Sequence, residues 1–268
     1  MQLASPGAIL WSYGSITIRY YGVMIAFGFI CALYAASRLA KKNNLSVDHL
    51  VNMALWSFIF GIVGARAYYV LLSWSSFVHR PIEMFATWNG GLSIHGGIIG
   101  GIIAAYIYLR KYKQSFLKYA DVMGACIPLA QAIGRWGNFF NSEAYGLPVS
   151  DDFPLKLYIP PASRTLQFQE QAYFHPTFLY ESVFNLALFF ILYFGVAQRF
   201  KRYPGLTFCL YLAGYSIGRI IIEPLRVDSF SKIFNYPVPL VVSAVFLVLS
   251  LSAAIACIQR AANMQDST

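Results

Sequence analysis

The residues best suited to chemistry in this sequence lie in the run GRWGNFFNSEAYG at residues 134–146. The planar guanidinium of arginine binds phosphate oxygens through two parallel hydrogen bonds, so Arg135 could hold a phosphate group. Asn138 and Asn141 offer neutral donors and acceptors, and Glu143 could orient the cation or accept a hydrogen bond from a hydroxyl group. This set of side chains suits a glycerophosphate. The alternative is a loop that only caps helix ends.

A second set of polar residues follows helical spacing. Tyr215, Arg219 and Glu223 stand at i, i+4 and i+8, which places them on one face of a helix and lets Arg219 pair with Glu223. Such a pair is either part of a site or a structural ion pair that locks two helices together. Pro224 follows directly, and we expect it to disrupt or end the helix.

One histidine, His95, stands between glycines in the run GGLSIHGG. The glycines remove side chains on both sides, so another backbone or a ligand head group could approach the imidazole closely. Gly96 and Gly97 also pair with Gly100 and Gly101 in a small-xxx-small pattern that is typical of helix packing. Packing explains the glycines better than the histidine, because a buried imidazole needs hydrogen-bond partners. We therefore expect a functional role for His95.

A third cluster combines His175-Pro176 with Tyr180-Glu181. Proline favours the first turn of a helix, so His175 is expected near a helix N-cap and Glu181 one turn inside. These side chains could support a site from a second layer, or only anchor the loop.

All these residues belong to a chain that is too apolar for an ordinary soluble domain. Of its 268 residues, 58% are hydrophobic and 12% are charged, and the mean hydropathy is +0.55. Apolar runs of about 20 residues, the length at which a helix crosses a bilayer, recur along the chain. The sequence therefore predicts an all-α polytopic membrane protein that forms one domain over residues 1–268. Seven transmembrane helices are expected near residues 18–37, 48–72, 92–109, 117–133, 178–197, 206–223 and 238–258.

The basic residues indicate the orientation of these spans. They gather after the first, third and fifth spans, at Arg38, Lys41, Lys42, Arg110, Lys111, Lys113, Lys118, Arg199, Lys201 and Arg202. Cytoplasmic loops are rich in Lys and Arg, so the N-terminus is expected outside and the C-terminus in the cytoplasm. The net charge of +9 then reflects membrane topology, and no nucleic acid is expected as a partner. Residues 147–174 are polar and proline-rich, and we interpret them as a small extracytoplasmic cap between the fourth and fifth spans.

Charged groups inside a membrane are costly, so the depth of each one is informative. At about 1.5 Å per residue, five ionisable residues fall at one level in the outer half of the membrane. They are Arg66, His95, Arg135, Arg219 and Glu223. This level predicts a site near lipid phosphates, although Arg66 could instead snorkel to the surface.

Two other classes of function remain as alternatives. A transporter or lipid flippase would need polar residues along the whole path through the bilayer. Here they stop halfway, and only Asp121, interpreted as an ordinary interfacial residue, lies towards the inner side. A transferase that moves a group from a glycerophosphate lipid to a sugar or glycan is not excluded by residue chemistry.

The run at residues 134–146 resembles the signature stretch of the bacterial prolipoprotein diacylglyceryl transferase family, G-R-x-G-N-F-x-N-x-E-x-x-G, at every fixed position. The resemblance covers nearly the whole chain and includes the seven-span topology. It extends to Tyr21-Gly22, His95-Gly96-Gly97, His175-Pro176, Tyr180-Glu181, Tyr215, Gly218, Arg219, Glu223, Arg226 and Asp228. Pro224 departs from the family pattern and affects the expected placement of Arg226.

The resemblance implies that the diacylglyceryl group of phosphatidylglycerol moves to the thiol of the lipobox cysteine in a prolipoprotein signal peptide, with release of glycerol 1-phosphate. It also implies a site on the periplasmic side of the bacterial cytoplasmic (inner) membrane, with lipid entering from the bilayer. The displacement needs a nucleophile and a stabilised leaving group, and we expect no metal or organic cofactor.

The implied residues fall into three groups. Arg135 and Arg219 would stabilise the leaving phosphate, and His95 would be the base or would position it; alternatively, the two arginines lower the thiol pKa and no histidine base exists. The substrate-binding residues would be Tyr21, Arg66, Asn138, Asn141, Glu143, Gly146, Tyr215, Glu223 and Arg226. His175, Tyr180 and Glu181 would form the second layer.

Overall fold

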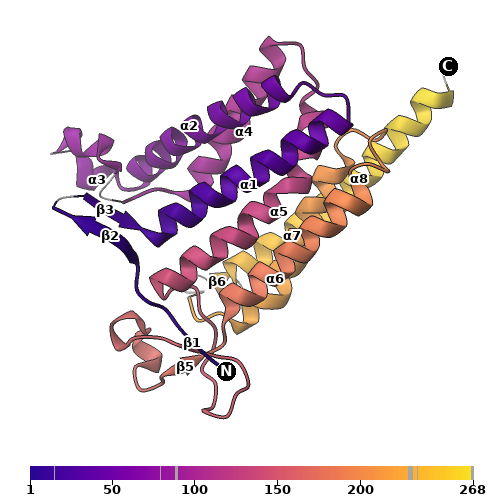
Figure 1. Ribbon diagram of the computed structural model, residues 1–268. Coiled ribbons are helices and arrows are strands. Elements are labelled where there is room, and N and C mark those ends of the chain that lie inside the picture. Colours follow the sequence, from indigo (N-terminus) through magenta and orange to yellow (C-terminus); the bar gives the residue numbers. More distant parts are fainter. Residues whose placement is uncertain (15, 79, 88–89, 229–231, 234, 267–268) are drawn as a thin grey trace. The chain divides into compact units, whose positions relative to one another are not determined.

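The computed structural model describes every residue except 15, 79, 88–89, 229–231, 234 and 267–268. Long α-helices make up most of the chain, and the few strands are short (Figure 1). The chain divides into two compact units. The first contains residues 1–39 and 120–268, and the second contains residues 40–119.

A helix occupies each of the seven positions at which the sequence predicts a span. These helices are α1 (Tyr20–Lys42), α2 (Val47–Leu72), α4 (Ile94–Lys111), α5 (Phe116–Asn141), α6 (Thr177–Phe190, continued by the π-helical turn η5, Ile191–Val196), α7 (Leu206–Ile222) and α8 (Val238–Asp266). Within the described residues, five helices are long and apolar enough to cross a membrane: α1, α2, α6, α7 and α8. The multi-pass helical membrane character is therefore confirmed. Helices α4, of 18 residues, and α5, of 26 residues, are not among these five.

The fourth predicted span was too short. We expected a loop from residue 134, but α5 continues to Asn141, so Arg135, Asn138 and Asn141 are helical. Tyr21 of α1 packs where Gly137 has no side chain: a Cβ there would lie 2.8 Å from the tyrosine ring. The helix stops where Ser142 turns to a φ of +53°, a left-handed conformation typical of helix C-termini.

Hydrogen bonds between side chains and backbone groups connect the helices of the first unit. Figure 1 shows α6, α7 and α8 side by side. Ser182 of α6 donates a hydrogen bond to the carbonyl of Ala132 in α5 at 2.8 Å. At the N-terminus of α7, the Asp121 carboxylate of α5 accepts hydrogen bonds from the backbone N–H groups of Gly205 (2.7 Å) and Phe208 (2.9 Å). Asp121 is therefore a helix cap, not an ordinary interfacial residue as the sequence suggested.

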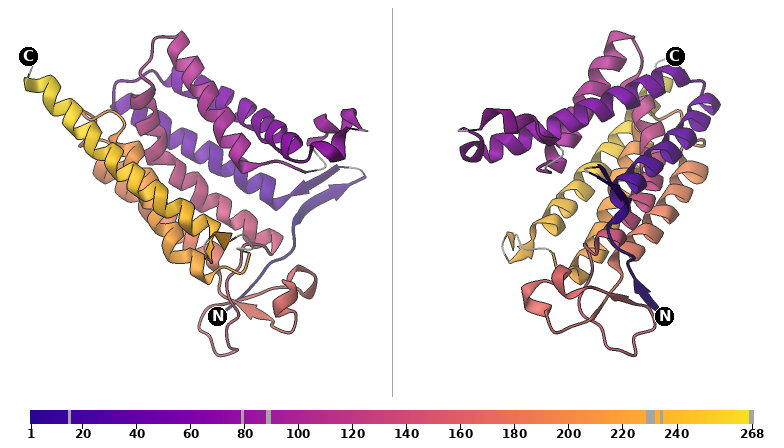
Figure 2. Two further views of the ribbon diagram at one scale, coloured as in Figure 1. Left: turned by 180° about the vertical axis from the view of Figure 1, so that it is seen from behind. Right: turned by 60° about the vertical axis from the view of Figure 1, so that its left-hand side comes forward.

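A small cap lies between α5 and α6. Strands β4 (Lys156–Tyr158) and β5 (Tyr173–Phe174) pair antiparallel, and β1 (Gln2–Ala4) adds to β4 in parallel, so the sheet order is β1-β4-β5. The 3₁₀ turns η3 (Pro161–Ser163) and η4 (Leu166–Phe168) connect the two strands. Both views in Figure 2 show the first strand entering the cap. The sequence analysis did not foresee this strand.

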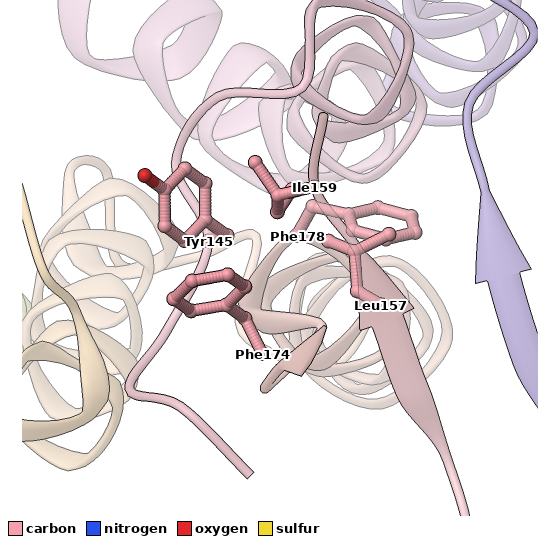
Figure 3. Packing of buried hydrophobic residues seen from close by; sticks show 5 residues of the cluster. All are labelled: Tyr145, Leu157, Ile159, Phe174 and Phe178. Atoms are coloured by element: carbon pink, nitrogen blue, oxygen red, sulfur yellow. The ribbon is translucent and has the colours of Figure 1, made fainter. Parts of the chain in front are cut away.

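Buried side chains join the cap to the helices. Tyr145, Leu157, Ile159, Phe174 and Phe178 form one hydrophobic cluster (Figure 3), in which Phe178 belongs to α6. The Tyr145 hydroxyl donates to the Ser163 carbonyl at 3.0 Å and accepts from the N–H of Thr165 at 2.8 Å. The chain that follows α5 is thereby fixed at the start of α6.

Two further hairpins belong to the first unit. Strands β2 (Ile9–Tyr13) and β3 (Ile16–Arg19) form an exposed antiparallel hairpin before α1, and β6 (Lys232–Ile233) pairs with β7 (Tyr236–Pro237) before α8. Neither hairpin was predicted.

The second unit is built on α2 and α4, which pack through glycines. A Cβ on Gly96 would lie 2.2 Å from the carbonyl oxygen of Gly64, and one on Gly100 would lie 2.4 Å from that of Phe60. The backbones of the two helices therefore touch, as the packing interpretation of the glycines expected. Along the chain, α2 is followed by the short helix α3 (Trp74–Phe77) and the 3₁₀ turn η1 (Pro81–Phe85), and α4 comes after them.

Candidate active site

Glu181 is the centre of a cluster of arginines in the first unit. Its carboxylate, in a residue that is 5% exposed, contacts guanidinium groups from three segments of the chain. Oε2 binds Nε of Arg135, and Oε1 binds Nη1 of Arg219 at 3.2 Å and Nη1 of Arg226 at 2.7 Å. The sequence predicts Glu181 in a supporting layer, whereas in the structure the Glu181 carboxylate binds all three arginines.

Two more carboxylates complete the cluster. Glu223 is 1% exposed, and its Oε2 lies 2.6 Å from Nη2 of Arg219 in an ion pair, so the predicted pair at i, i+4 is present. Asp228 binds Arg226 through both oxygens, with Nε–Oδ1 at 2.9 Å. Burial by itself lowers the pKa of Arg226, but the hydrogen bonds and charges of Asp228 and Glu181 outweigh it, and the pKa is raised. Three guanidinium groups thus face three carboxylates, which offsets much of the cost of burying like charges together.

The end of α7 brings Arg226 back to the cluster. Pro224 stops the α-helix after Ile222, and the chain makes one 3₁₀ turn, η6, at Glu223–Leu225. Arg226 then adopts an extended conformation, with φ −84° and ψ 142°. The proline therefore determines how Arg226 reaches Glu181 outside the helical phase of Arg219.

A hydrogen-bonded chain extends from Arg135 to the end of α5. Nη1 of Arg135 donates to Oδ1 of Asn138 at 3.4 Å, and Nδ2 of Asn138 donates to Oε1 of Glu143 at 2.8 Å. The Arg135 side chain is 23% exposed, compared with 16% for Arg219 and 7% for Arg226. Arg135 is therefore the most accessible of the three cations to an incoming anion.

The segment after α5 is held between two other parts of the chain. The N–H of Gly146 donates to the His175 carbonyl at 2.9 Å, and the N–H of Leu147 donates to the Leu225 carbonyl at 2.7 Å. A Cβ on Gly146 would lie 2.7 Å from the His175 Cβ and 2.9 Å from the Leu225 oxygen. Only glycine fits there without displacing its neighbours, so Gly146 aligns the segments that carry Arg135, Glu181 and Arg226.

His175 and Tyr180 contact each other beside this segment. Nδ1 of His175 lies 3.2 Å from the Tyr180 hydroxyl, and the Phe153 ring meets the imidazole edge-on at 4.8 Å. Burial lowers the pKa of His175, so its neutral form is favoured near neutral pH. Helix α6 begins at Thr177, and its N-cap residue is Pro176. The sequence predicted Pro176 in the first turn, so the helix begins one residue later than expected.

A small cavity lies below Arg219, on the side of α6 and α7. It has a volume of about 10 Å³, enough for one water molecule, and is lined by Glu181, Phe184, Asn185, Tyr215, Gly218, Arg219 and Ile222. Among the described residues, Oδ1 of Asn185 has no hydrogen-bond partner although Asn185 is 3% exposed. Asn185 is not among the residues predicted from the sequence. An amide side chain one helical turn after Glu181, in an otherwise apolar run, could have indicated it.

Other predicted residues have less direct positions in the first unit. Tyr21 packs on Gly137, as described above, and Tyr215 lines the small cavity. Oδ1 of Asn141 is buried and has no partner within the described part of the chain.

Arg66 and His95 belong to the second unit. His95 is the second residue of α4, and its ring centroid lies 6.2 Å from that of Tyr68 in α2. Arg66 is 8% exposed and donates hydrogen bonds to backbone carbonyls of the segment between α2 and α4.

Comparison with known proteins identifies the family. The family model described as "Prolipoprotein diacylglyceryl transferase" matches residues 8–257. Relatives named phosphatidylglycerol--prolipoprotein diacylglyceryl transferase include one from Synechococcus elongatus, 43% identical over 85% of this chain and 80% of its own. Others come from Synechocystis (44%; 85% and 81%) and Acaryochloris marina (45%; 84% and 81%). The resemblance seen at residues 134–146 is thus confirmed, and the chain belongs to the prolipoprotein diacylglyceryl transferase family.

Proposed function

We propose that this chain transfers the diacylglyceryl group of phosphatidylglycerol to the lipobox cysteine thiol of a prolipoprotein, and that the reaction takes place at the arginines around Glu181. The observation that carries the proposal is this set of three arginines, from three segments, on one buried carboxylate in a chain of this family. A fixed group of guanidinium ions is suited to a substrate that carries a phosphodiester and leaves as a phosphate monoester.

The reaction displaces a phosphate from carbon. The cysteine sulfur attacks the terminal glyceryl carbon, a carbon–sulfur bond forms, and the bond from that carbon to the phosphate oxygen breaks. The thiol proton is removed, and the electron pair of the broken bond leaves with glycerol 1-phosphate, whose phosphate gains one negative charge. Groups that stabilise this growing charge lower the barrier most.

Arg135 and Arg219 are the residues that we assign to the leaving phosphate. Arg135 is the most exposed cation of the cluster, and Arg219 binds the other oxygen of the same Glu181 carboxylate. Because Glu181 and Glu223 hold the guanidinium groups before substrate arrives, little reorganisation is needed during the reaction.

The thiol must lose its proton, because the thiolate is the nucleophile. His95 is assigned as the base or as the residue that positions the base, since a neutral imidazole nitrogen can accept a proton. In the alternative assignment, Arg135 and Arg219 lower the thiol pKa and no histidine base is needed. An unshifted pH profile with most activity retained in His95→Asn would select the alternative.

The remaining residues orient the head group and the cations. We assign this role to Tyr21, Asn138, Asn141, Glu143, Gly146, Tyr215, Glu223 and Arg226, with His175, Tyr180 and Glu181 supporting them. The hydrogen-bonded chain from Arg135 through Asn138 to Glu143 supports the assignment for those residues.

The proposal includes seven spans in the bacterial cytoplasmic membrane, with the N-terminus and the site on the periplasmic side. Basic residues end α1 and α4, at Lys41, Lys42, Arg110 and Lys111. Arg135 lies near the end of α5, Glu181 near the start of α6 and Arg219 near the end of α7, which is the alternation expected if each helix crosses the membrane.

The test uses purified full-length protein in phosphatidylglycerol micelles with a lipobox peptide and with the same peptide carrying serine for cysteine. We expect glycerol phosphate and lipidated peptide only with the cysteine peptide. Equal release of glycerol phosphate with the cysteine and the serine peptide, or no release with correctly folded wild-type protein, would contradict the proposal. Release that requires a sugar acceptor instead would support the glycan alternative.

A further inference from the structure

Arg66 of α2 donates four hydrogen bonds to the segment that precedes α4. Nε donates to the carbonyl oxygen of Met84 at 2.9 Å, and Nη2 donates to that of Glu83 at 2.6 Å. Nη1 donates to the carbonyl oxygens of Gly90 at 2.7 Å and Gly91 at 3.0 Å. Four of the five N–H groups of the guanidinium are therefore used by backbone carbonyls.

Aromatic rings occupy positions above the same guanidinium. Its central carbon lies 5.6 Å from the ring centroid of Tyr69 and 5.4 Å from that of Phe77, both within cation–π range. The Glu83 carboxylate lies 3.4 Å from Arg80, so Glu83 meets Arg66 through its carbonyl and Arg80 through its side chain. The Arg66 charge is thus surrounded by carbonyl dipoles and aromatic faces.

The segment is shaped to fit this arginine. Gly90 and Gly91 have φ values of +83° and +72°, which favour glycine. A Cβ on Gly91 would lie 2.7 Å from Nη1 of Arg66 and 2.4 Å from the Tyr69 ring. The two carbonyl pairs, at residues 83–84 and 90–91, are therefore brought together by one side chain.

The same turn of α2 also fixes the start of α4. The N–H of Ser93 donates to the Ala65 carbonyl at 3.0 Å, and the backbone of Gly96 rests against that of Gly64. His95 stands between these two contacts, four residues after Gly91. The position of the imidazole relative to α2 thus depends on a short run of contacts that begins at Arg66.

We propose that Arg66 is a positioning residue that orders residues 83–87 and 90–93 and thereby sets the position of His95. This inference rests on the proposed function for the role of His95. It replaces the expectation that Arg66 binds a lipid phosphate. An anion would find one N–H of Arg66 and four carbonyl oxygens around it, which is a poor phosphate site.

Substitution by lysine separates the two roles. Lysine keeps the positive charge but has a single ammonium group, which cannot reach four carbonyls arranged around a planar fork. A phosphate-binding cation would tolerate Arg66→Lys in part, whereas a carbonyl-binding fork would not. Arg80→Lys is the matched control, because Arg80 lies three residues before Glu83, contacts its carboxylate, and has a side chain that is 72% exposed.

Amide hydrogen exchange tests the structural step without any activity. In purified full-length protein, Arg66→Lys and Arg66→Met are expected to speed exchange at residues 83–87 and 90–93, and Arg80→Lys is not. Gly91→Ala, which leaves the arginine in place and adds a methyl group against it, should speed exchange in the same segment. Wild-type exchange in both Arg66 variants would overturn the proposal.

Kinetics test the link to His95. With the cysteine peptide, Arg66→Lys should lower kcat by about tenfold or more, as a misplaced catalytic group does, with KM for phosphatidylglycerol nearly unchanged. In a His95→Asn background the same substitution should have little further effect. A raised KM with normal kcat would mean lipid binding, and independent effects would mean no link to His95; either result overturns the proposal. If wild-type protein transfers no diacylglyceryl group, the proposed function fails, while the exchange experiment still decides whether Arg66 orders the segment.

Discussion

One carboxylate shared by three guanidinium groups makes Glu181 the most consequential single residue of the cluster. Its oxygens hold Arg135, Arg219 and Arg226, and they come from a residue with almost no exposure to solvent. Removing its charge would leave three cations facing the two carboxylates of Glu223 and Asp228. The arginines would then repel one another and lose the arrangement that a phosphate requires.

We therefore expect Glu181→Gln to lower kcat for transfer on the order of 100-fold, since preorganised charge is the main source of stabilisation for the leaving phosphate. The measurement is glycerol phosphate release with the cysteine peptide. Glu170→Gln, an exposed carboxylate in the cap, is the matched control and should keep wild-type activity. A Glu181→Gln protein with more than half of the wild-type rate would contradict the assignment.

His175 gives the fold a dependence on pH. Burial lowers its pKa below the ordinary 6.5, so below that value the unfolded chain binds a proton that the folded chain does not. Stability is therefore full above the unfolded pKa and falls as pH decreases through it towards the folded pKa. We expect the wild-type Tm to drop between about pH 7.5 and about pH 5.5, and to drop less in His175→Gln. Equal drops in both proteins would refute this origin.

At the scale of elements, apolar periodicity predicted the positions of the helices but not where each one ends. Arg135, Asn138 and Asn141 are polar, so their run was expected to be a loop, yet packing of Tyr21 on Gly137 extends α5 through it. The pairing of β1 with β4 left no local signal, because its partners lie far apart in the chain. The signature run contains Arg135, and helical spacing paired Arg219 with Glu223, but the central place of Glu181 depends on how α5, α6 and α7 pack, which spacing alone does not specify.

Asp121 links two of these elements, because it belongs to α5 and caps α7. We expect Asp121→Asn to lower the free energy of unfolding by about 1 kcal/mol, the usual effect of weakening a cap and its interaction with the helix dipole. Thermal unfolding of the purified protein measures this. Asp152→Asn, at an exposed position in the cap, serves as control and should leave Tm unchanged. An unchanged Tm in Asp121→Asn would show that the cap contributes nothing.

For the whole molecule, the proposed topology can be tested from the two sides of the membrane. Leu166 is 92% exposed in the cap, and Lys113 is exposed between α4 and α5. In intact cells from which the outer membrane has been made permeable, a membrane-impermeant maleimide should label Leu166→Cys. It should label Lys113→Cys only after the cytoplasmic membrane is opened. The protein also has four free native cysteines, all in helices. Labelling of the unsubstituted protein therefore measures the background labelling that they contribute. The reverse pattern would invert the proposed orientation.

The parallel pairing of β1 with β4 has a consequence for biosynthesis. Gln2 meets Lys156, so the first strand is made more than 150 residues before its partner exists. At a synthesis rate of about 5–20 residues per second, the strand must wait roughly 8 to 30 s on the ribosome-bound chain. Its edge stays open to other chains during that interval, and the sheet can close only after α1, α2, α4 and α5 have been synthesised. The sheet is complete only when β5 has followed β4 out of the ribosome, so residues from the very start of the protein take part in a structure that forms after most of its length has been synthesised.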